Sequence, residues 1–164
     1  MNRSHLILSA LLLTWAPPIS ARLDLNGDQF SDLWQLHFGA EGLAETDDPD
    51  NDGSNTREEE AAGTDPFDPN SRLHIEGLSV SDTEFTITWN AQAHKSYFIE
   101  TSSDLVTWLP GPSVHSEGGL EMATIESSET EQFCRILVQD RDHDGDGLTD
   151  YEESLLGFDP NNSN

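Results

Sequence analysis

The chain has 164 residues, and its 32 acidic side chains against seven basic ones give a formal net charge of −25 at pH 7. This charge repels nucleic acid and anionic membrane surfaces, so it excludes a nucleic-acid-binding protein. The single cysteine, Cys134, cannot form an internal disulfide, so in an exported domain bound metal would have to replace that covalent staple.

Residues 1–21 have the layout of a secretory signal peptide. A basic start is followed by the apolar run of residues 6–13 and by small residues that end at Ala21. The run is shorter than the roughly 20 residues that a membrane-spanning helix needs. We therefore expect export to a secreted or cell-surface location, with no membrane span after cleavage. Arg22 is the expected first mature residue, and cleavage after Ala16 is the alternative.

A pattern of oxygen-bearing residues follows the leader and occurs twice in tandem. An EF-hand-type loop offers calcium ligands at positions 1, 3, 5, 7, 9 and 12 and has glycine at position 6. In the first copy the expected ligands are Asp24, Asn26, Asp28, the Phe30 carbonyl and Asp32. In the second copy they are Asp48, Asp50, Asp52, the Ser54 carbonyl, Thr56 and Glu59.

The first copy departs from the pattern at two positions. Gln29 replaces the glycine of the sharp turn, and Gln35 replaces the glutamate at position 12. We therefore expect the first site to be the weakest of the set, with a strained turn at Gln29 and one negative charge fewer.

Residues 73–139 change to period-2 alternation with many β-branched and aromatic residues, which is typical of strands. The expected strands are Leu73–Val80, Thr83–Trp89, Ser96–Thr101, Leu120–Ile125 and Phe133–Val138. Short strands separated by turn residues favour a small antiparallel β-sandwich. Its core is expected to contain Trp89, Tyr97, Ile99, Ile125 and Phe133, and Cys134 is expected to be a small buried residue.

The third and best-preserved loop lies near the C-terminus. Its expected ligands are Asp142, Asp144, Asp146, the Leu148 carbonyl, Asp150 and Glu153, with Gly147 at the turn position. Each of the three loops is followed by a short helical segment that stops at a glycine, namely Gly39, Gly63 and Gly157.

No helix is expected to enter any of the loops, because a strand or a short extended segment precedes each one. The expected units are therefore extended segment, loop and helix, and their calcium affinity is expected to fall in the extracellular range of about 10⁻⁴ to 10⁻³ M. The fold class is mainly β with short helices, a small antiparallel β-sandwich flanked by EF-hand-like calcium loop-helix units. The expected divisions are 1–21 signal peptide, 22–72 tandem repeats, 73–139 sandwich and 140–164 C-terminal repeat.

Two stretches carry a resemblance to known families. The Asp-x-Asp-x-Asp-Gly motif followed by Gly-Thr-Asp-Pro, in residues 48–66, resembles the thrombospondin type 3-like calcium repeats of exported bacterial proteins. Trp89 together with residues 97–108 looks like the small fibronectin type III-like module found beside such repeats. The resemblance implies calcium-dependent structural and spacer elements rather than catalysts.

The leading hypothesis is thus a secreted calcium-binding structural protein that is not an enzyme, because the acids cluster at metal-ligand spacing instead of facing each other across a cleft. The alternative is a calcium-dependent adhesion or carbohydrate-binding module with an extracellular glycan or protein partner, in which Trp108 stacks on a sugar instead of covering the core. Dockerin-like docking is disfavoured because Glu59 and Glu153 stand where dockerin-like loops usually carry aspartate.

Overall fold

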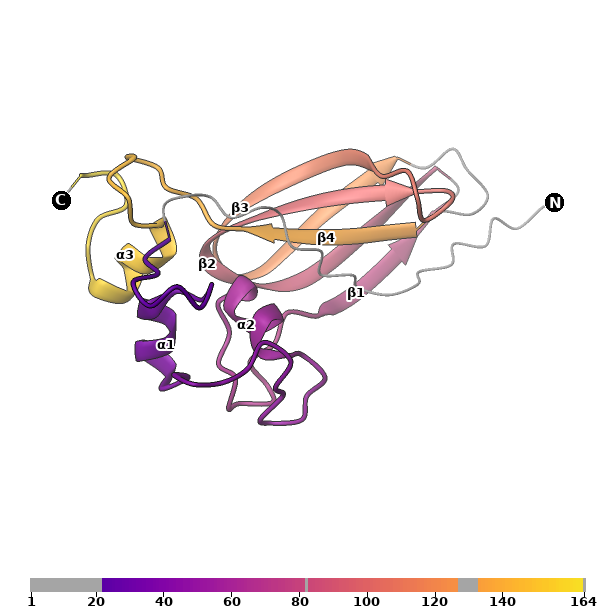
Figure 1. The fold of residues 1–164 in the computed structure, drawn as a ribbon. Coiled ribbons are helices and arrows are strands. Elements are labelled where there is room, and N and C mark those ends of the chain that lie inside the picture. The colour runs from indigo at the N-terminus through magenta and orange to yellow at the C-terminus, as the bar shows by residue number, and fades with distance from the viewer. Residues whose placement is uncertain (1–21, 82, 127–132, 164) are drawn as a thin grey trace.

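The computed structural model describes residues 22–81, 83–126 and 133–163, so the predicted signal peptide lies outside the described residues. In these ranges the elements are α1 (Asp32–Phe38), α2 (Thr56–Ala62), β1 (Ile75–Val80), β2 (Glu84–Ser102), β3 (Leu109–Glu126), β4 (Phe133–Gln139) and α3 (Asp150–Leu156) (Figure 1). The expected fold class is confirmed: the chain is mostly antiparallel sheet with short helices. Within the described ranges, no helix has the length and apolar character to cross a membrane.

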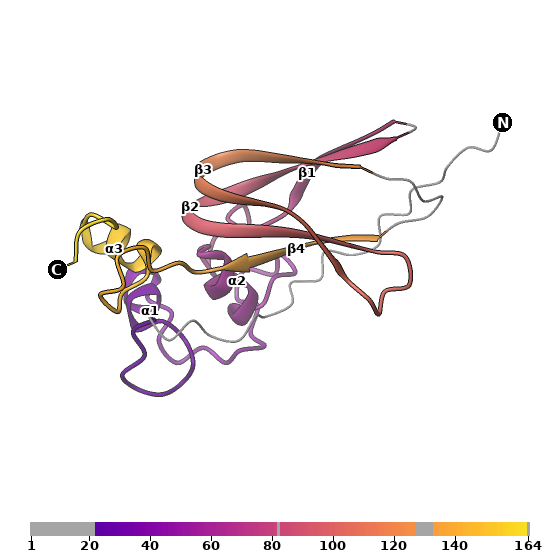
Figure 2. The same ribbon diagram turned by 90° about the horizontal axis from the view of Figure 1, so that it is seen from above.

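The sheet is one long β2–β3 hairpin that bends back on itself. β1 pairs with the first half of β2, where Ile75 lies opposite Trp89, and β4 pairs with the second half, where Ser96 lies opposite Gln139. Seen from above, the bent hairpin forms two arms, with β1 beside one arm and β4 beside the other (Figure 2). The two arms form two layers, an arrangement that is consistent with a small β-sandwich-like domain.

The bend is made by an irregular corner in β2 and by glycines in β3. The β2–β3 register shifts between Ala93 and Ser96, and His94 between them has a φ of 65°. On β3, Gly118 and Gly119 have φ values of 91° and 100°, which a residue with a Cβ rarely adopts. Extra residues at a bulge bend a strand without ending its pairing, so the hairpin turns the corner as one ribbon.

Three expected strands are therefore wrong in their bounds. The expected strands Thr83–Trp89 and Ser96–Thr101 are parts of the single strand β2, which starts at Glu84, and β3 starts at Leu109 rather than at Leu120. The alternation of buried and exposed residues breaks at the corner, which makes one bent strand look like two strands and a turn. The pairing across the bulge keeps both halves in one strand.

The main core lies between the two arms. Trp89, Tyr97, Ile99 and Ile125 are buried there as expected, while Phe133 is only partly buried at the start of β4. The other buried members are Ala62, Leu73, Phe85, Ile87, Ala123, Cys134, Ile136 and Val138. Burial of each large side chain stabilises the fold by about 1.5–3 kcal/mol, so these residues supply most of its stability.

A second, smaller core joins the two ends of the described chain. Trp34 of α1 and Tyr151 of α3 are buried against each other together with Ala40, and the two helices lie side by side (Figure 1). The Trp34 indole donates to the Thr64 carbonyl at 2.9 Å, and the Tyr151 hydroxyl donates to the Gly63 carbonyl at 3.0 Å. The first and third repeats therefore meet each other and the end of α2.

Candidate metal centres

The three loops share one backbone course. Positions 4 and 6 have positive φ in every copy: Gly27 and Gln29, Asn51 and Gly53, and Gly145 and Gly147. The turn at position 6 follows from the pattern, and Gln29 has the strained φ of 72° that its place predicts. Position 4 was missed by the sequence reasoning, although glycine and asparagine, which tolerate this conformation best, mark it in all three copies.

Backbone amides orient the acidic side chains in each loop. The carboxylate of Asp142 accepts from the N–H groups of Gly145 at 2.7 Å and Gly147 at 3.3 Å, and Asp24 and Asp48 accept from amides of their own loops in the same way. The residues at positions 3 and 5 likewise accept from amides two residues further on. These contacts fix both oxygens of the position 1 aspartates and one oxygen of the side chains at positions 3 and 5, and they set the course of each loop.

Each loop passes directly into its helix at position 9. The residues at position 8, Ser31, Asn55 and Thr149, are N-caps whose side chains accept a backbone N–H of the first turn. The position 9 amide donates to the carbonyl just before the loop in all copies, at 2.9, 2.8 and 2.6 Å. The glycine stops are confirmed, because Gly39, Gly63 and Gly157 are left-handed C-caps.

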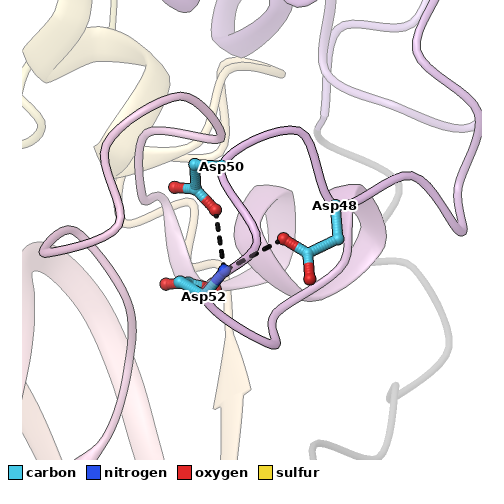
Figure 3. Close-up of side chains that lie close together, drawn as sticks. All are labelled: Asp48, Asp50 and Asp52. Atoms are coloured by element: carbon cyan, nitrogen blue, oxygen red, sulfur yellow. Dashed lines mark hydrogen bonds between the residues drawn. The ribbon is translucent and has the colours of Figure 1, made fainter.

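The second loop gathers three carboxylates. Asp48, Asp50 and Asp52 each offer an oxygen within 4.8 Å of the others (Figure 3). The amide of Asp52 donates to both Asp48 and Asp50 at 3.2 Å. Asp50 Oδ2 and Asp52 Oδ2 are buried without a hydrogen-bond partner. Buried carboxylate oxygens of this kind are unfavourable unless a cation binds them, so the triad has the chemistry of a cation site.

Glu59 lies fully buried at position 12 of the same loop. Its Oε2 has no hydrogen-bond partner, and its Oε1 accepts only a long contact of 3.5 Å from the Thr64 hydroxyl. Burial raises the pKa of Glu59 to about 8, and the neighbouring charges of Asp50, Asp52 and Asp48 add to that rise. A fourth carboxylate that is repelled by an acidic triad favours a bound cation, which would offset this repulsion.

The third loop repeats the arrangement. Asp142, Asp144 and Asp146 form the second group of carboxylates within 4.8 Å of one another in the described ranges. Asp144 Oδ2 is buried without a hydrogen-bond partner, and Glu153 at position 12 is fully buried. The two loops thus present the same donor set of three aspartates and one buried glutamate.

The other expected ligands hold the backbone of the loops. At position 9, Asp32 Oδ2 accepts from the Leu25 amide at 2.7 Å, Asp150 Oδ1 accepts from the His143 amide at 2.7 Å, and the Thr56 hydroxyl donates to the Asp47 carbonyl at 3.1 Å. At position 7 the amides of Phe30, Ser54 and Leu148 donate to the position 5 carboxylates. The roles of these residues as ligands stay predictions.

The first loop differs in its chemistry. Asp28 Oδ2 accepts from the Gln35 side chain at 2.9 Å and from the Asn26 side chain at 3.0 Å. Burial alone would raise the pKa of Asp28, but hydrogen bonds from Phe30, Gln35 and Asn26 hold it below its ordinary value. In this loop the Asp28 carboxylate accepts hydrogen bonds from the chain itself, so a bound cation would stabilise the loop less.

A central polar junction links the three repeats, and the sequence reasoning missed it. Ser31 donates its amide to Glu60 Oε1 at 3.1 Å and its hydroxyl to Glu152 Oε1 at 2.5 Å. Arg22 also binds Glu60, at 2.8 Å. Glu60 and Glu152 are the sequence neighbours of the position 12 glutamates. The adjacent glutamates of α2 and α3 were the available signal: one of each pair occupies position 12 of the loop pattern, and the other lies at the junction.

A comparison with known families identifies the second and third loops as repeats of one known type. Residues 48–69 and 142–163 match the family model described as the Bacterial TSP3 repeat. These segments are the second and third loops with their helices, so the expected thrombospondin type 3-like repeats are confirmed there. Such repeats are of a calcium-binding type and are typical of extracellular proteins. No curated protein and no solved structure gives a significant match to the chain, and the fibronectin type III-like module stays a prediction.

Proposed function

We propose that this is a secreted, non-enzymatic calcium-binding protein, in which two Ca²⁺ ions order acidic loops around a small β-sandwich that serves as a structural or spacer element. The observation that carries the proposal is the repeated donor set. Asp48, Asp50, Asp52 and Glu59 would hold one ion, and Asp142, Asp144, Asp146 and Glu153 would hold the other. The ion supplies positive charge and coordination to these oxygens.

The donor set favours calcium among the common metals. All of the carboxylate ligands are hard oxygen donors, and neither set includes the histidine or cysteine that zinc sites favour. Calcium accepts six to eight oxygens in flexible geometry, which suits a loop with further carbonyl and water ligands.

The positions of the loops explain how calcium would stabilise the sandwich. The helix that follows the second loop places Ala62 in the main core, and the third loop begins three residues after the last residue of β4, Gln139. Clustered aspartates repel one another when no cation is bound. This repulsion acts on the second loop, next to α2, and on the third loop, next to the end of β4. Binding of an ion at each loop therefore fixes α2 under the sheet and α3 beyond the end of β4.

Two measurements test the proposal: calorimetric titration with calcium, and thermal unfolding in calcium and in EDTA. We expect two calcium sites and a higher melting temperature in calcium, because the ion binds the folded chain alone. Replacement of Asp142 and Asp146 by alanine should remove one site, and replacement of Asp48 and Asp52 the other. The control replaces the exposed Glu84 and Glu117, which removes the same charge outside the loops. Identical melting curves in calcium and EDTA would contradict the proposal.

Calcium-dependent adhesion is the second candidate function. Apolar side chains near the start of β3 are exposed beside the partly buried Trp108: Val106 is 82% exposed and Leu109, the first residue of β3, is 61% exposed. The Arg135 guanidinium covers one face of the Trp108 ring at 4.1 Å from its centroid. A glycan array in calcium and in EDTA tests this role, and binding lost on Trp108→Ala would favour it over a purely structural one.

A further inference from the structure

Lys95 is the one lysine of the sequence, and it is buried. It is 2% exposed and lies at the corner of β2, one residue before Ser96, which pairs with Gln139 at the end of β4. Asp140 follows Gln139, so the two charged side chains occupy neighbouring places just beyond the last paired residues. Lys95 Nζ lies 2.5 Å from Asp140 Oδ1.

The Lys95 end of this pair is shielded from water. Lys95 Nζ lies 4.4 Å from the centroid of the Tyr151 ring and 3.5 Å from the Glu60 carbonyl. Together with Trp34 and others, these residues line a pocket that leaves no space for a water molecule. A lysine placed in such a pocket loses its hydration, and one carboxylate contact repays this only in part.

We propose that Lys95 and Asp140 become joined by an intramolecular isopeptide bond. A proton first passes from Nζ to the Asp140 carboxylate across their contact, so the net charge of the pair does not change. The Nζ lone pair then attacks the Asp140 Cγ, a bond between Nζ and Cγ forms, and a second proton moves from nitrogen to the departing hydroxyl. The Cγ–O bond breaks, and one water molecule leaves. No oxidant, reductant or co-reactant is needed.

Three features favour this condensation. The reacting groups are held in contact beside the Ser96–Gln139 pair of β2 and β4, which replaces a bimolecular encounter by an intramolecular one. The Lys95 side chain is 2% exposed, so little water reaches the nitrogen, and the Asp140 side chain, 20% exposed, lets the released water leave. The Glu60 backbone carbonyl lies 3.5 Å from Lys95 Nζ and can accept a hydrogen bond from the nitrogen while positive charge is on it.

The bond would be a covalent cross-link in a chain that has no internal disulfide. Cys134 is the only cysteine and is buried, so no disulfide can close the sandwich. A Lys95–Asp140 link would close the segment between β2 and the start of the third repeat, and it would restrict the unfolded chain as a disulfide does. This role does not depend on calcium binding.

Intact-mass spectrometry of the denatured, purified chain tests the proposal directly. The expected mass is lower than the mass calculated from the sequence by one water molecule. Digestion provides an independent measurement, because an endoproteinase specific for lysine can cut this sequence only after Lys95. Linked chain resists that cut, whereas unlinked chain gives two fragments. Peptide mapping with a second protease should find the peptides of Lys95 and Asp140 joined.

Variants separate the bond from an accidental loss of water. Lys95→Arg keeps the positive charge and Asp140→Ala removes the acyl group, and both should show the full calculated mass; Asp140→Ala should also be cut by the lysine-specific protease. Glu117→Gln, at an exposed site, should keep the loss of one water. If the unaltered protein has its full calculated mass and is cut into two fragments, Lys95 and Asp140 form an ion pair only and the proposal is overturned.

Discussion

The Gln35 side-chain amide donates a hydrogen bond to Asp28 Oδ2 across the first loop, at 2.9 Å. Glu59 and Glu153 occupy the corresponding position in the two other loops, and both are fully buried. An amide donor and a carboxylate acceptor satisfy each other, whereas a glutamate adds negative charge beside other acids. The first loop therefore satisfies the Asp28 carboxylate from the chain itself, whereas under the proposed function a bound cation would stabilise the other two loops.

Substitution Gln35→Glu should convert the first loop into a calcium-dependent one. Without calcium the new carboxylate repels Asp28 and loses the hydrogen bond, so we expect the free energy of unfolding to fall by about 1–3 kcal/mol. Millimolar calcium should restore the stability, and calorimetry should count one more ion than in the unaltered protein. Gln92→Glu, which adds the same charge outside the loops, is the control. An equal ion count in both variants would contradict the assignment of Gln35.

Gly63 and Gly39 offer a matched pair of substitutions to alanine. Both are left-handed C-caps, with φ values of 75° and 69°, so each alanine variant should lose about 1–2 kcal/mol from backbone strain. A Cβ on Gly63 would also lie 2.9 Å from Lys95 Cε and 3.0 Å from the Tyr151 ring, whereas one on Gly39 meets nothing within 4 Å. We expect Gly63→Ala to be the more destabilising variant by about 1–3 kcal/mol, because its Cβ would overpack the contact with Lys95 and Tyr151. Urea unfolding in calcium measures both variants, and equal losses of stability would show that Lys95 and Tyr151 move to make room for the Cβ.

Local patterns predict much of this fold because local physics determines it. The three helices, their glycine ends and the turn strain at Gln29 follow from residue types at fixed spacing. The long strand β2 does not follow, because its bulge near His94 breaks the alternation while β3 keeps the pairing. Continuity of a strand depends on its partner, which lies elsewhere in the sequence.

The candidate site, like the fold, was predictable from the sequence only where its residues lie close together in the chain. The two aspartate triads follow from their spacing, since all members lie within a few residues of one another. The junction at Ser31 could not be predicted, because Glu60 and Glu152 reach it from repeats 29 and 121 residues away. The contact between Lys95 and Asp140 likewise depends on the pairing of β2 with β4.

Ser31→Ala should loosen the first repeat from the third. The hydroxyl of Ser31 caps α1 by accepting from the Trp34 amide at 3.3 Å and donates to Glu152 at 2.5 Å. Loss of both contacts should lower the free energy of unfolding by about 1–3 kcal/mol. Urea unfolding in calcium measures the loss, with the exposed Ser79→Ala as control. If the two variants unfold at the same urea concentration, the junction contributes nothing to the stability.

The buried Glu59 should make the calcium-free protein less stable as the pH rises. Burial and the nearby aspartates raise the pKa of Glu59 from 4.5 to about 8 in the folded chain. Between these values the unfolded chain has released this proton and the folded chain retains it, so the folded state binds more protons and its stability falls with increasing pH. Below about pH 4.5 both states are protonated, and the contribution of Glu59 is fully present.

Calcium should reverse this dependence, because the ion binds the ionised carboxylate and displaces the proton. In EDTA we expect the melting temperature to fall between about pH 5 and pH 8, and in calcium to stay level or rise. At pH 7 calcium binding should release close to one proton at this site, measurable by calorimetry in buffers of different ionisation enthalpy. Glu59→Gln should flatten the EDTA profile and abolish the proton release, whereas Glu41→Gln, at an exposed site, should change neither. An unaltered pH profile in Glu59→Gln would show that another group carries the proton.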